Sequence, residues 1–330
     1  MPRDVLRIAL REIVAYADQT GFDHVDVVWQ GGEPLLAGLE FFKSAQRYLK
    51  AIGGPIRIRQ FMQTNGWLLD DAWCRFLAEH DVQVGLSLDG PQALHDAFRC
   101  DHRGDGTHAR VVQAFFRATH HGLRVGFNAV ATPRAMHSAA DIYDFFRRMG
   151  CGFRDNPLLP AGRAASLLSH LSFNGEYGRF LCELFDIWAT TPKSRVRISP
   201  LDGFLKALLT GFSNECQFLP TCAGAFLAIR SDGTAFICSR FHSHPLGNIC
   251  NASVPTLFGR SIVRRIKARV DGLSQCHACQ NWHLCYGGCP YSALLVRGCV
   301  DKRDPFCHDY QRIYAHLKKA LSPLAPDEAP

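Results

Sequence analysis

The chain has 330 residues, of which 47% are hydrophobic, and it carries a formal net charge of +7. This length and composition are typical of a soluble protein with one large folded domain or two. No stretch approaches the roughly 20 apolar residues of a membrane-spanning helix. The mild charge is compatible with an acidic partner and equally with no charged partner.

The first half alternates short apolar strands with longer helical patterns. In the helical stretches apolar residues recur three or four positions apart, and a helix separates each strand from the next. Such an order requires parallel strand pairing, which favours a parallel α/β sheet, either doubly wound or rolled into a barrel. The expected strands are Val25–Gln30, Ile58–Gln63, Val82–Leu88 and Val125–Val130. The expected helices are Val5–Asp18, Leu39–Ile52, Asp70–Glu79, Ala109–His120 and Ala139–Met149.

Loops with turn-forming and polar residues follow the first three of these strands. Each loop alone is ordinary turn chemistry. Ligands bind where the strands of a parallel sheet end, so three such loops together indicate a shared ligand site. In the first loop the glycines allow close approach of a ligand, and Glu33 offers a carboxylate to an ammonium group. The loops are Gln30-Gly31-Gly32-Glu33-Pro34, Thr64-Asn65-Gly66 and Ser87-Leu88-Asp89-Gly90-Pro91.

The pattern changes after Ser194, where strands become short and Gly and Cys become frequent. We therefore place a domain boundary between residues 195 and 196. The second part shows no large apolar core of its own, so bound metal is expected to supply much of its stability. A basic run in it is expected to form the solvated face of a short helix. The run consists of Arg260, Arg264, Arg265, Lys267 and Arg269.

Eight cysteines in the second part have spacings typical of metal ligands. Iron–sulfur clusters are typically held by four cysteines each, so eight can hold two. Structural zinc is an alternative, because it also uses C-x2-C pairs. Disulfides are another, but they belong to oxidising compartments, and the N-terminus has no apolar signal core, which favours a cytoplasmic protein. The eight are Cys216, Cys222, Cys238, Cys276, Cys279, Cys285, Cys289 and Cys307.

The other six cysteines are scattered along the chain and are expected to be small buried hydrophobes. They are Cys74, Cys100, Cys151, Cys182, Cys250 and Cys299.

Residues 25–130 resemble the radical S-adenosylmethionine (SAM) superfamily, and the C-terminal cysteine pattern resembles the SPASM domain, which carries two auxiliary [4Fe–4S] clusters. The closest likeness is to anaerobic sulfatase maturases and related maturases of ribosomal peptides. It rests on QGGEPLL at 30–36, QTNGWLLDDAWC at 63–74, VGLSLDGPQALHDAFR at 84–99 and CYGGCP at 285–290. The resemblance implies a partial (β/α)6 TIM-type barrel over residues 1–195, lacking its first strand, and a SPASM iron–sulfur domain over 196–330.

The resemblance also implies roles for individual residues. Gly31, Gly32 and Glu33 match the motif that holds the SAM amino group. Ser87 and Arg99 match SAM-binding positions, and Gln30 matches a position near the substrate. The first auxiliary cluster would be ligated by Cys216, Cys222, Cys238 and Cys289, and the second by Cys276, Cys279, Cys285 and Cys307.

Two features depart from the family pattern. The CxxxCxxC motif, whose cysteines bind the cluster that cleaves SAM, is absent, since the first cysteine is Cys74. A truncated gene model is the plainest explanation, and a genuine cluster-less descendant is the alternative. The chain as given is therefore expected to be inactive, with a third [4Fe–4S] cluster only if the motif is restored. The second departure is Ser239, which stands where sulfatase maturases have an aspartate base.

A serine hydroxyl has no useful basicity near neutral pH without an adjacent base. His242 and His244 follow Ser239 closely and are candidates for that base, although histidines in a loop are more often solvated. Formylglycine formation, which needs a base near the substrate, is therefore not the expected reaction.

We expect instead a radical SAM maturase that abstracts a hydrogen from a peptide or protein for an oxidative modification such as a crosslink. One alternative is an anaerobic sulfatase maturase, which converts Cys or Ser to formylglycine. The other is a non-catalytic iron–sulfur module that binds peptides. The expected partners are a peptide or protein substrate and a reductant such as flavodoxin or ferredoxin, with neither nucleic acid nor a membrane.

Overall fold

The computed structural model describes residues 1–52, 54, 56–162, 164–165, 173–192, 196–213 and 215–322. The chain forms two compact units, each made of separate segments of the sequence. The first unit comprises Met1–Leu88, His95–Phe127 and Ala223–Arg264, and the second comprises Asp89–Leu94, Asn128–Cys222 and Arg265–Pro330. The boundary expected at 195 falls on residues 193–195, which lie outside the described residues, so the division into 1–195 and 196–330 stays a prediction.

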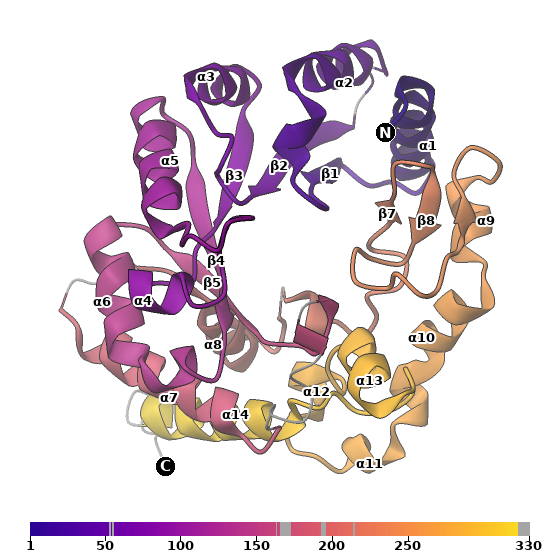
Figure 1. The fold of residues 1–330 in the computed structure, drawn as a ribbon. Coiled ribbons are helices and arrows are strands. Elements are labelled where there is room, and N and C mark those ends of the chain that lie inside the picture. The colour runs from indigo at the N-terminus through magenta and orange to yellow at the C-terminus, as the bar shows by residue number, and fades with distance from the viewer. Residues whose placement is uncertain are drawn as a thin grey trace, which may run out of the picture. The chain divides into compact units, whose positions relative to one another are not determined.

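The principal sheet has six strands that follow one another in chain order, from β1 to β6 (Figure 1). β1 pairs with β2 in parallel, with Val27 opposite Gln60, and β2 pairs with β3 in parallel, with Met62 opposite Val84. β5 and β6 are also parallel. The strands are β1 (His24–Trp29), β2 (Arg57–Thr64), β3 (Val82–Ser87), β4 (Val125–Ala131), β5 (Phe153–Pro157) and β6 (Ile198–Ser199).

Helices connect these strands, and the helix–strand alternation predicted for the first half is confirmed. The helices of this half are α1 (Arg3–Gln19), α2 (Leu39–Ile52), α3 (Asp71–Glu79), α4 (Gln92–His95), α5 (His108–His120) and α6 (Ala139–Met149), with short 3-10 turns η1 (Pro34–Ala37) and η2 (Ala135–His137). α2 and α6 have the predicted bounds, and the other predicted elements differ by one or two residues at their ends.

Local chemistry explains several of these boundaries. α3 starts after Asp70, whose Oδ1 accepts a hydrogen bond from the backbone N–H of Trp73 at 2.9 Å. α6 ends at Gly150, whose φ of 66° is left-handed, a conformation that favours glycine. In β3 buried and half-buried residues alternate strictly, as expected for a strand with two different faces.

The later part of the chain is mainly helical, with a small antiparallel sheet of three strands. The strands of this sheet are β7 (Ala228–Ile229), β8 (Thr234–Phe236) and β9 (Gly247–Asn248). The helices are α7 (Glu176–Thr190), α8 (Leu201–Thr210), η4 (Cys216–Phe218), α9 (Val254–Phe258), α10 (Ser261–Gly272), α11 (Ser274–His277), α12 (Trp282–Cys285), α13 (Pro290–Arg297) and α14 (Cys307–Leu321).

The expectation that the second part lacks a large apolar core is wrong. α14 packs along α7 and also contacts α8 (Figure 1). Between these helices lies an aromatic cluster, in which Phe204 contacts the rings of Phe218, Tyr310 and Tyr314 at centroid distances of 5.1–6.1 Å. All four side chains are buried. The apolar residues of α14 are interspersed with Lys, His and Gln, which is why their common face was not recognised in the sequence.

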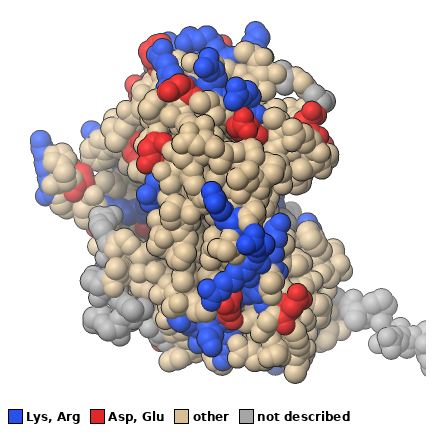
Figure 2. All heavy atoms as spheres, turned by 90° about the vertical axis from the view of Figure 1, so that its right-hand side faces the viewer, with Lys and Arg blue, Asp and Glu red and all other residues tan. Residues whose placement is uncertain are grey.

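The basic run of α10 follows the predicted pattern with one exception. Val263 and Ile266 are buried, while Arg264 and Lys267 are exposed. Figure 2 shows Lys and Arg side chains gathered on the side of the molecule where α10 lies. The exception is Arg269, which is only 5% exposed, so the prediction of a solvated position is wrong for this residue. No helix among the described residues is long and apolar enough to cross a membrane.

Two of the buried carboxyl groups of the second unit are Asp89, two residues after the end of β3, and Asp155, within β5. Asp89 accepts a hydrogen bond from the backbone N–H of Val130 at 3.0 Å. Oδ2 of Asp155 is buried without a hydrogen-bond partner among the described residues. Burial, followed by the negative charge of Asp89, raises the pKa of Asp155 well above its usual range. The folded chain therefore holds a proton here that the unfolded chain releases.

Replacing Asp155 by asparagine should flatten the pH dependence of stability. The pKa of Asp155 is higher in the folded chain than in the unfolded chain. Asp155 therefore stabilises the fold most at a pH below its pKa in the unfolded chain. The wild-type protein then loses stability as the pH rises toward the folded pKa, by up to about 1.4 kcal/mol per pH unit. Urea unfolding between pH 5 and 9 should show a shallower decline for Asp155→Asn than for wild type. The exposed Asp271→Asn serves as the control, and equal slopes for wild type and Asp155→Asn would contradict the prediction.

Candidate functional site

The first candidate site lies at the carboxyl ends of β1, β2 and β3, within the first unit. Gly31 and Gly32, directly after β1, have φ values of 99° and 55°. These left-handed conformations favour glycine, and an added Cβ at either position would meet nothing within 4 Å. The glycines are therefore required by the backbone turn, and the space beside them is open to a ligand.

Glu33 ties the end of β1 to the end of β2. Its Oε1 accepts hydrogen bonds from Leu35 N at 3.1 Å and from Thr64 Oγ1 at 2.6 Å, and its Oε2 accepts one from Asn65 N at 2.8 Å. A carboxylate has about four acceptor positions. Three of them are used within the chain, so the carboxylate is held in one orientation and keeps about one position for an external donor.

The remaining predicted SAM and substrate residues also belong to the first unit. Ser87 ends β3, and its Oγ accepts a hydrogen bond from Gln63 Nε2 at 3.0 Å. The backbone of Arg99 is fixed, because its carbonyl accepts hydrogen bonds from N and Oγ1 of Thr107 at 3.2 and 3.0 Å. Gln30 is exposed directly after β1. The structure thus places Gly31, Gly32 and Glu33 after β1 and Ser87 at the end of β3, the two strands that flank β2, while their binding roles stay predictions.

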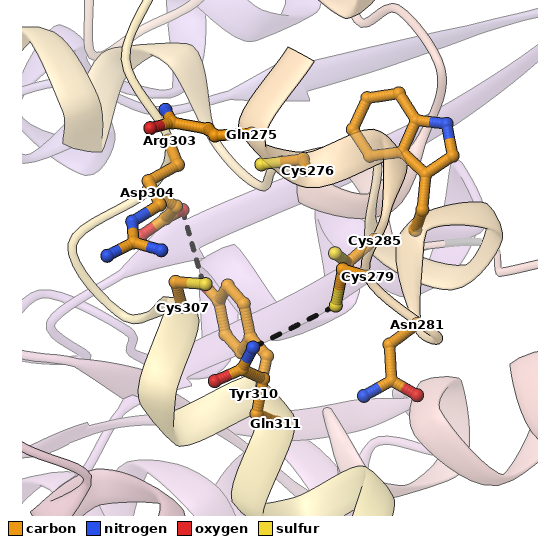
Figure 3. A pocket seen from close by; sticks show the side chains of 12 residues that line it. Gln275, Cys276, Cys279, Asn281, Cys285, Arg303, Asp304, Cys307, Tyr310 and Gln311 are labelled. Atoms are coloured by element: carbon orange, nitrogen blue, oxygen red, sulfur yellow. Dashed lines mark hydrogen bonds between the residues drawn. The ribbon is translucent and has the colours of Figure 1, made fainter. Parts of the chain in front are cut away.

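The second candidate site is a pocket of about 40 Å³ in the second unit, which is more than the roughly 10–15 Å³ that one water needs. Four of its lining side chains are the cysteines expected to ligate one cluster, and their sulfur atoms point toward the space between them (Figure 3). They come from three stretches of chain: the turn at α11, the end of α12 and the start of α14. The four are Cys276, Cys279, Cys285 and Cys307.

Three successive left-handed residues turn the chain after Cys285. Tyr286, Gly287 and Gly288 have φ values of 45°, 79° and 72°. An added Cβ on Gly287 would come within 2.3 Å of Leu273, and one on Gly288 within 2.4 Å of Asp304. The two glycines are therefore required both by the backbone and by close packing, and they direct the chain from Cys285 to Cys289, the N-cap of α13.

A buried carboxyl group, Asp304, connects the ligand-bearing loops. Its Oδ2 accepts hydrogen bonds from the backbone N–H of Cys289 at 2.6 Å and from the hydroxyl of Tyr310 at 3.2 Å. Its own backbone carbonyl accepts from the N–H of Cys307 at 3.2 Å. Burial raises the pKa of Asp304 to about 6. On the other side of the pocket, Gln311 Nε2 donates to Cys279 Sγ at 3.8 Å.

Burial also governs the thiols of this pocket. It raises the pKa of Cys285 to about 12, and it raises the pKa of Cys276 and Cys307 as well. Thiols with raised pKa values are protonated and unreactive until a metal displaces the proton. None of the four forms a disulfide. For Cys276, Cys285 and Cys307 the raised pKa favours the protonated thiol in the metal-free protein.

A single metal ion would require the four sulfur atoms to lie close together. Around tetrahedral zinc, sulfurs at about 2.3 Å from the metal would stand only about 3.8 Å apart. Among the described residues, no group of three or more His, Cys, Asp or Glu side chains is arranged to hold one ion. The four cysteines line one pocket, and four thiolates are the ligand set that typically holds an iron–sulfur cluster.

The other four predicted ligands are distributed between the two units. Cys216, Cys222 and Cys289 belong to the second unit and Cys238 to the first, so their grouping stays a prediction. The position of Cys216 is supported by its neighbour Glu215, whose carboxylate accepts two hydrogen bonds from Arg154, at 2.6 and 3.1 Å.

Two sequence-based expectations in these regions need comment. Of the six scattered cysteines only Cys74 is buried, as expected. Cys151, Cys182 and Cys299 are half-buried, and the expectation is wrong for Cys100 and Cys250, which are exposed. Ser239 is exposed directly after Cys238. Nearby, His244 Nδ1 lies 2.9 Å from Ser243 Oγ, and His242 is exposed.

Comparison with known proteins decides the family. The profile of the Radical SAM superfamily matches residues 2–146. A serine-type anaerobic sulfatase-maturating enzyme of Klebsiella aerogenes is 31% identical over 96% of this chain and 78% of its own length. The chain belongs to the radical SAM family of the anaerobic sulfatase-maturating enzymes. A cysteine-type enzyme of Clostridium perfringens (strain 13 / Type A) is 29% identical over 98% of this chain and 89% of its own length.

A solved radical SAM structure of the same family confirms the fold class. Native anSMEcpe with bound AdoMet and Cp18Cys peptide superposes with a TM-score of 0.87 and 26% identity, covering 98% of this chain and 91% of that one. The fold is thus the mixed α/β architecture of that family, built on the parallel six-stranded sheet. As a family member, the protein is an enzyme of the radical SAM oxidoreductase type.

The residues that hold the cysteine-bearing loops of the second unit in place could not be predicted from the sequence. Asp304 and Arg269 hydrogen-bond these loops, and Gln311 hydrogen-bonds the sulfur of Cys279, a predicted ligand, yet their spacing follows no motif. The double glycine after Cys285 was the one available signal, because consecutive left-handed residues indicate a backbone that must pass close to something else.

Proposed function

We propose that the protein is a radical SAM maturase that removes a hydrogen atom from a peptide or protein substrate. The observation that carries this proposal is the pocket lined by Cys276, Cys279, Cys285 and Cys307, because four cysteines are the usual ligand set of an iron–sulfur cluster. The solved relative with bound AdoMet and a peptide supports the same pair of ligands here. When bound and reduced, SAM supplies the radical that takes the hydrogen atom.

The chain's own residues would bind and orient these ligands. Glu33 keeps one acceptor position for the ammonium group of SAM, and the turn at Gly31 and Gly32 leaves the backbone accessible. Ser87 and Arg99 would contact the rest of SAM. Gln30, exposed after β1, would face the peptide. This arrangement places the cofactor at the ends of the strands, as in other parallel α/β enzymes.

The cysteines would hold two auxiliary [4Fe–4S] clusters. Cys276, Cys279, Cys285 and Cys307 would ligate one, and Cys216, Cys222, Cys238 and Cys289 the other. Such clusters would accept the second electron that must leave the substrate if its oxidation is to be completed. A reductant such as flavodoxin or ferredoxin would supply the first electron. The expected cellular location is the cytoplasm.

The modification we favour is an oxidative crosslink rather than formylglycine formation. Conversion of Cys or Ser to a formyl group requires loss of a proton after the hydrogen atom is removed, and therefore a base near the substrate. Ser239 stands at the position of the family's aspartate and has no useful basicity alone. The second candidate, sulfatase maturation, is favoured by the names of the relatives that match nearly the whole chain.

One assay separates these candidates. The protein is expressed anaerobically from its full reading frame, including any codons that precede Met1, and is incubated with SAM, a reductant and a sulfatase-derived peptide that contains the target Cys or Ser. We expect 5′-deoxyadenosine to form, and mass spectrometry to find little or no formylglycine. Efficient formylglycine formation would support sulfatase maturation instead. Absence of 5′-deoxyadenosine with fully assembled clusters would support a non-catalytic peptide-binding module.

A further inference from the structure

Arg269 is the one residue of the basic run on α10 that turns inward. It is 5% exposed, and its guanidinium donates five hydrogen bonds of 2.7–3.3 Å. An arginine side chain has five N–H donors, so all of them are used. Every acceptor is a backbone carbonyl: those of Tyr286, Gly287, Gly288, Val300 and Lys302.

These carbonyls belong to two loops that carry predicted cluster ligands. Residues 286–288 join Cys285 to Cys289, and thus a ligand of one predicted cluster to a ligand of the other. Residues 300–302 lead toward Cys307. The left-handed turn at Gly287 and Gly288 directs its carbonyls inward, where buried acceptors would otherwise lack donors. Arg269 therefore holds both loops to α10 through one rigid group.

The positive charge of Arg269 also lies near cysteines from both predicted ligand sets. The guanidinium lies within electrostatic range of the Asp304 carboxyl group and of three cysteines: Cys222 and Cys289, predicted for the first cluster, and Cys276, predicted for the second. A guanidinium stays protonated in proteins, and its charge is poorly screened when buried. All five of its hydrogen bonds go to backbone carbonyls, so none of them pairs the guanidinium with a carboxylate.

We propose that Arg269 is a positioning residue for both auxiliary clusters, which holds the two ligand loops in place before metal arrives and raises the reduction potential of the clusters once they are bound. The inference rests on the proposed function, since it requires the clusters. Reduction adds negative charge to a cluster, and a buried cation favours the more negative form. Lysine would retain the charge but has only three donors for five carbonyls, and glutamine would lose the charge as well.

The test compares Arg269→Lys and Arg269→Gln with wild type in the full-length chain. In metal-free protein, hydrogen exchange of segments 285–289 and 300–304 should be faster in both variants, by about tenfold or more, because the loops open more often. After anaerobic reconstitution, both should contain less iron than wild type. In the clusters that do assemble, Arg269→Gln should show lower reduction potentials than Arg269→Lys by redox titration monitored by EPR.

Arg265→Gln is the matched control. Arg265 lies one turn earlier on α10 and contacts the same second loop from the exposed side, through a 2.6 Å hydrogen bond to Asp301. It should keep the iron content and the reduction potentials of wild type, and any faster exchange should be confined to segment 300–304, which contains Asp301. If Arg269→Lys shows the same hydrogen exchange and the same iron content as wild type, Arg269 does not hold the loops. This variant alone answers that question, even if Arg269→Gln does not fold.

Equal potentials in the lysine and glutamine variants would overturn the electrostatic role. If Arg269→Gln does not fold, wild-type potentials in Arg269→Lys support that role and lowered potentials overturn it. Absence of iron from reconstituted wild-type protein would count against the cluster proposal itself, while the exchange measurement on metal-free protein would still test whether Arg269 holds the loops.

Discussion

Replacement of Cys285 by serine should remove one of two clusters and leave the other in place. Wild-type protein reconstituted anaerobically should contain about eight iron atoms per chain, four for each [4Fe–4S] cluster, and the variant about four. Cys285 ends α12 with its sulfur directed into the four-cysteine pocket. A serine hydroxyl has nearly the same shape but is a hard oxygen donor, which suits iron–sulfur chemistry poorly.

The fold of the second unit should survive this loss. The aromatic cluster around Phe204 and Tyr314 packs α14 against α8 independently of the pocket, so the helical content by circular dichroism should be unchanged. Cys250→Ser, at an exposed thiol outside the predicted ligands, is the matched control and should keep full iron content. Full iron in Cys285→Ser would show that Cys285 is not a ligand, and zinc without iron or sulfide in wild type would favour the structural zinc alternative.

Replacement of Glu33 by glutamine should weaken SAM binding by roughly 10- to 150-fold. A hydrogen bond to a charged group contributes about 1.5–3 kcal/mol, and 1.4 kcal/mol is a factor of ten in affinity. Glutamine keeps one acceptor oxygen for Leu35 and Thr64 but removes the charge that would bind the ammonium group. Calorimetric titration of SAM into oxidised protein measures the effect.

A second ligand separates this role from a general disturbance of the loop. Glutamine also loses the acceptor for Asn65 N, so some weakening through loop disorder is expected. 5′-Methylthioadenosine has the sulfur and the nucleoside of SAM but no amino-acid group. Its affinity should be nearly the same for wild type and Glu33→Gln. An equal loss of affinity for both ligands would mean that Glu33 acts only by tying β1 to β2, and Glu40→Gln on the exposed face of α2 provides the surface control.

The first half of the fold could be predicted from the sequence because its signals are local. Strands such as β3 alternate by burial, and helices such as α6 show an apolar face and end at a glycine. The four cysteines of the pocket could likewise be grouped from their spacing and family resemblance. These features depend on residues close together in the chain or on a recurring motif.

The remainder depends on contacts between distant residues. In the sequence Arg269 cannot be told apart from the exposed basic residues around it. Its burial is favourable only because the turn at Gly287 and Gly288 offers backbone carbonyls to its guanidinium. The core under α14 pairs Tyr310 and Tyr314 with Phe204, about a hundred residues away in the chain, and no local pattern announces such a pairing. The burial of these residues depends on tertiary packing, which cannot be inferred from a single sequence without knowledge of its contacts.

Because the thiols differ in exposure, the rates at which a thiol reagent modifies them can report metal binding. In metal-free protein a thiol reagent should modify Cys100, Cys216 and Cys250 quickly, because these three are exposed, and should modify Cys285 slowly, because its thiol is buried and protonated. Once metal is loaded, Cys100 and Cys250 should still react, whereas Cys216 should become protected if it ligates the first cluster. The number of fast-reacting thiols would then decrease as the first cluster assembles, and this decrease would be independent of metal binding in the pocket around Cys285.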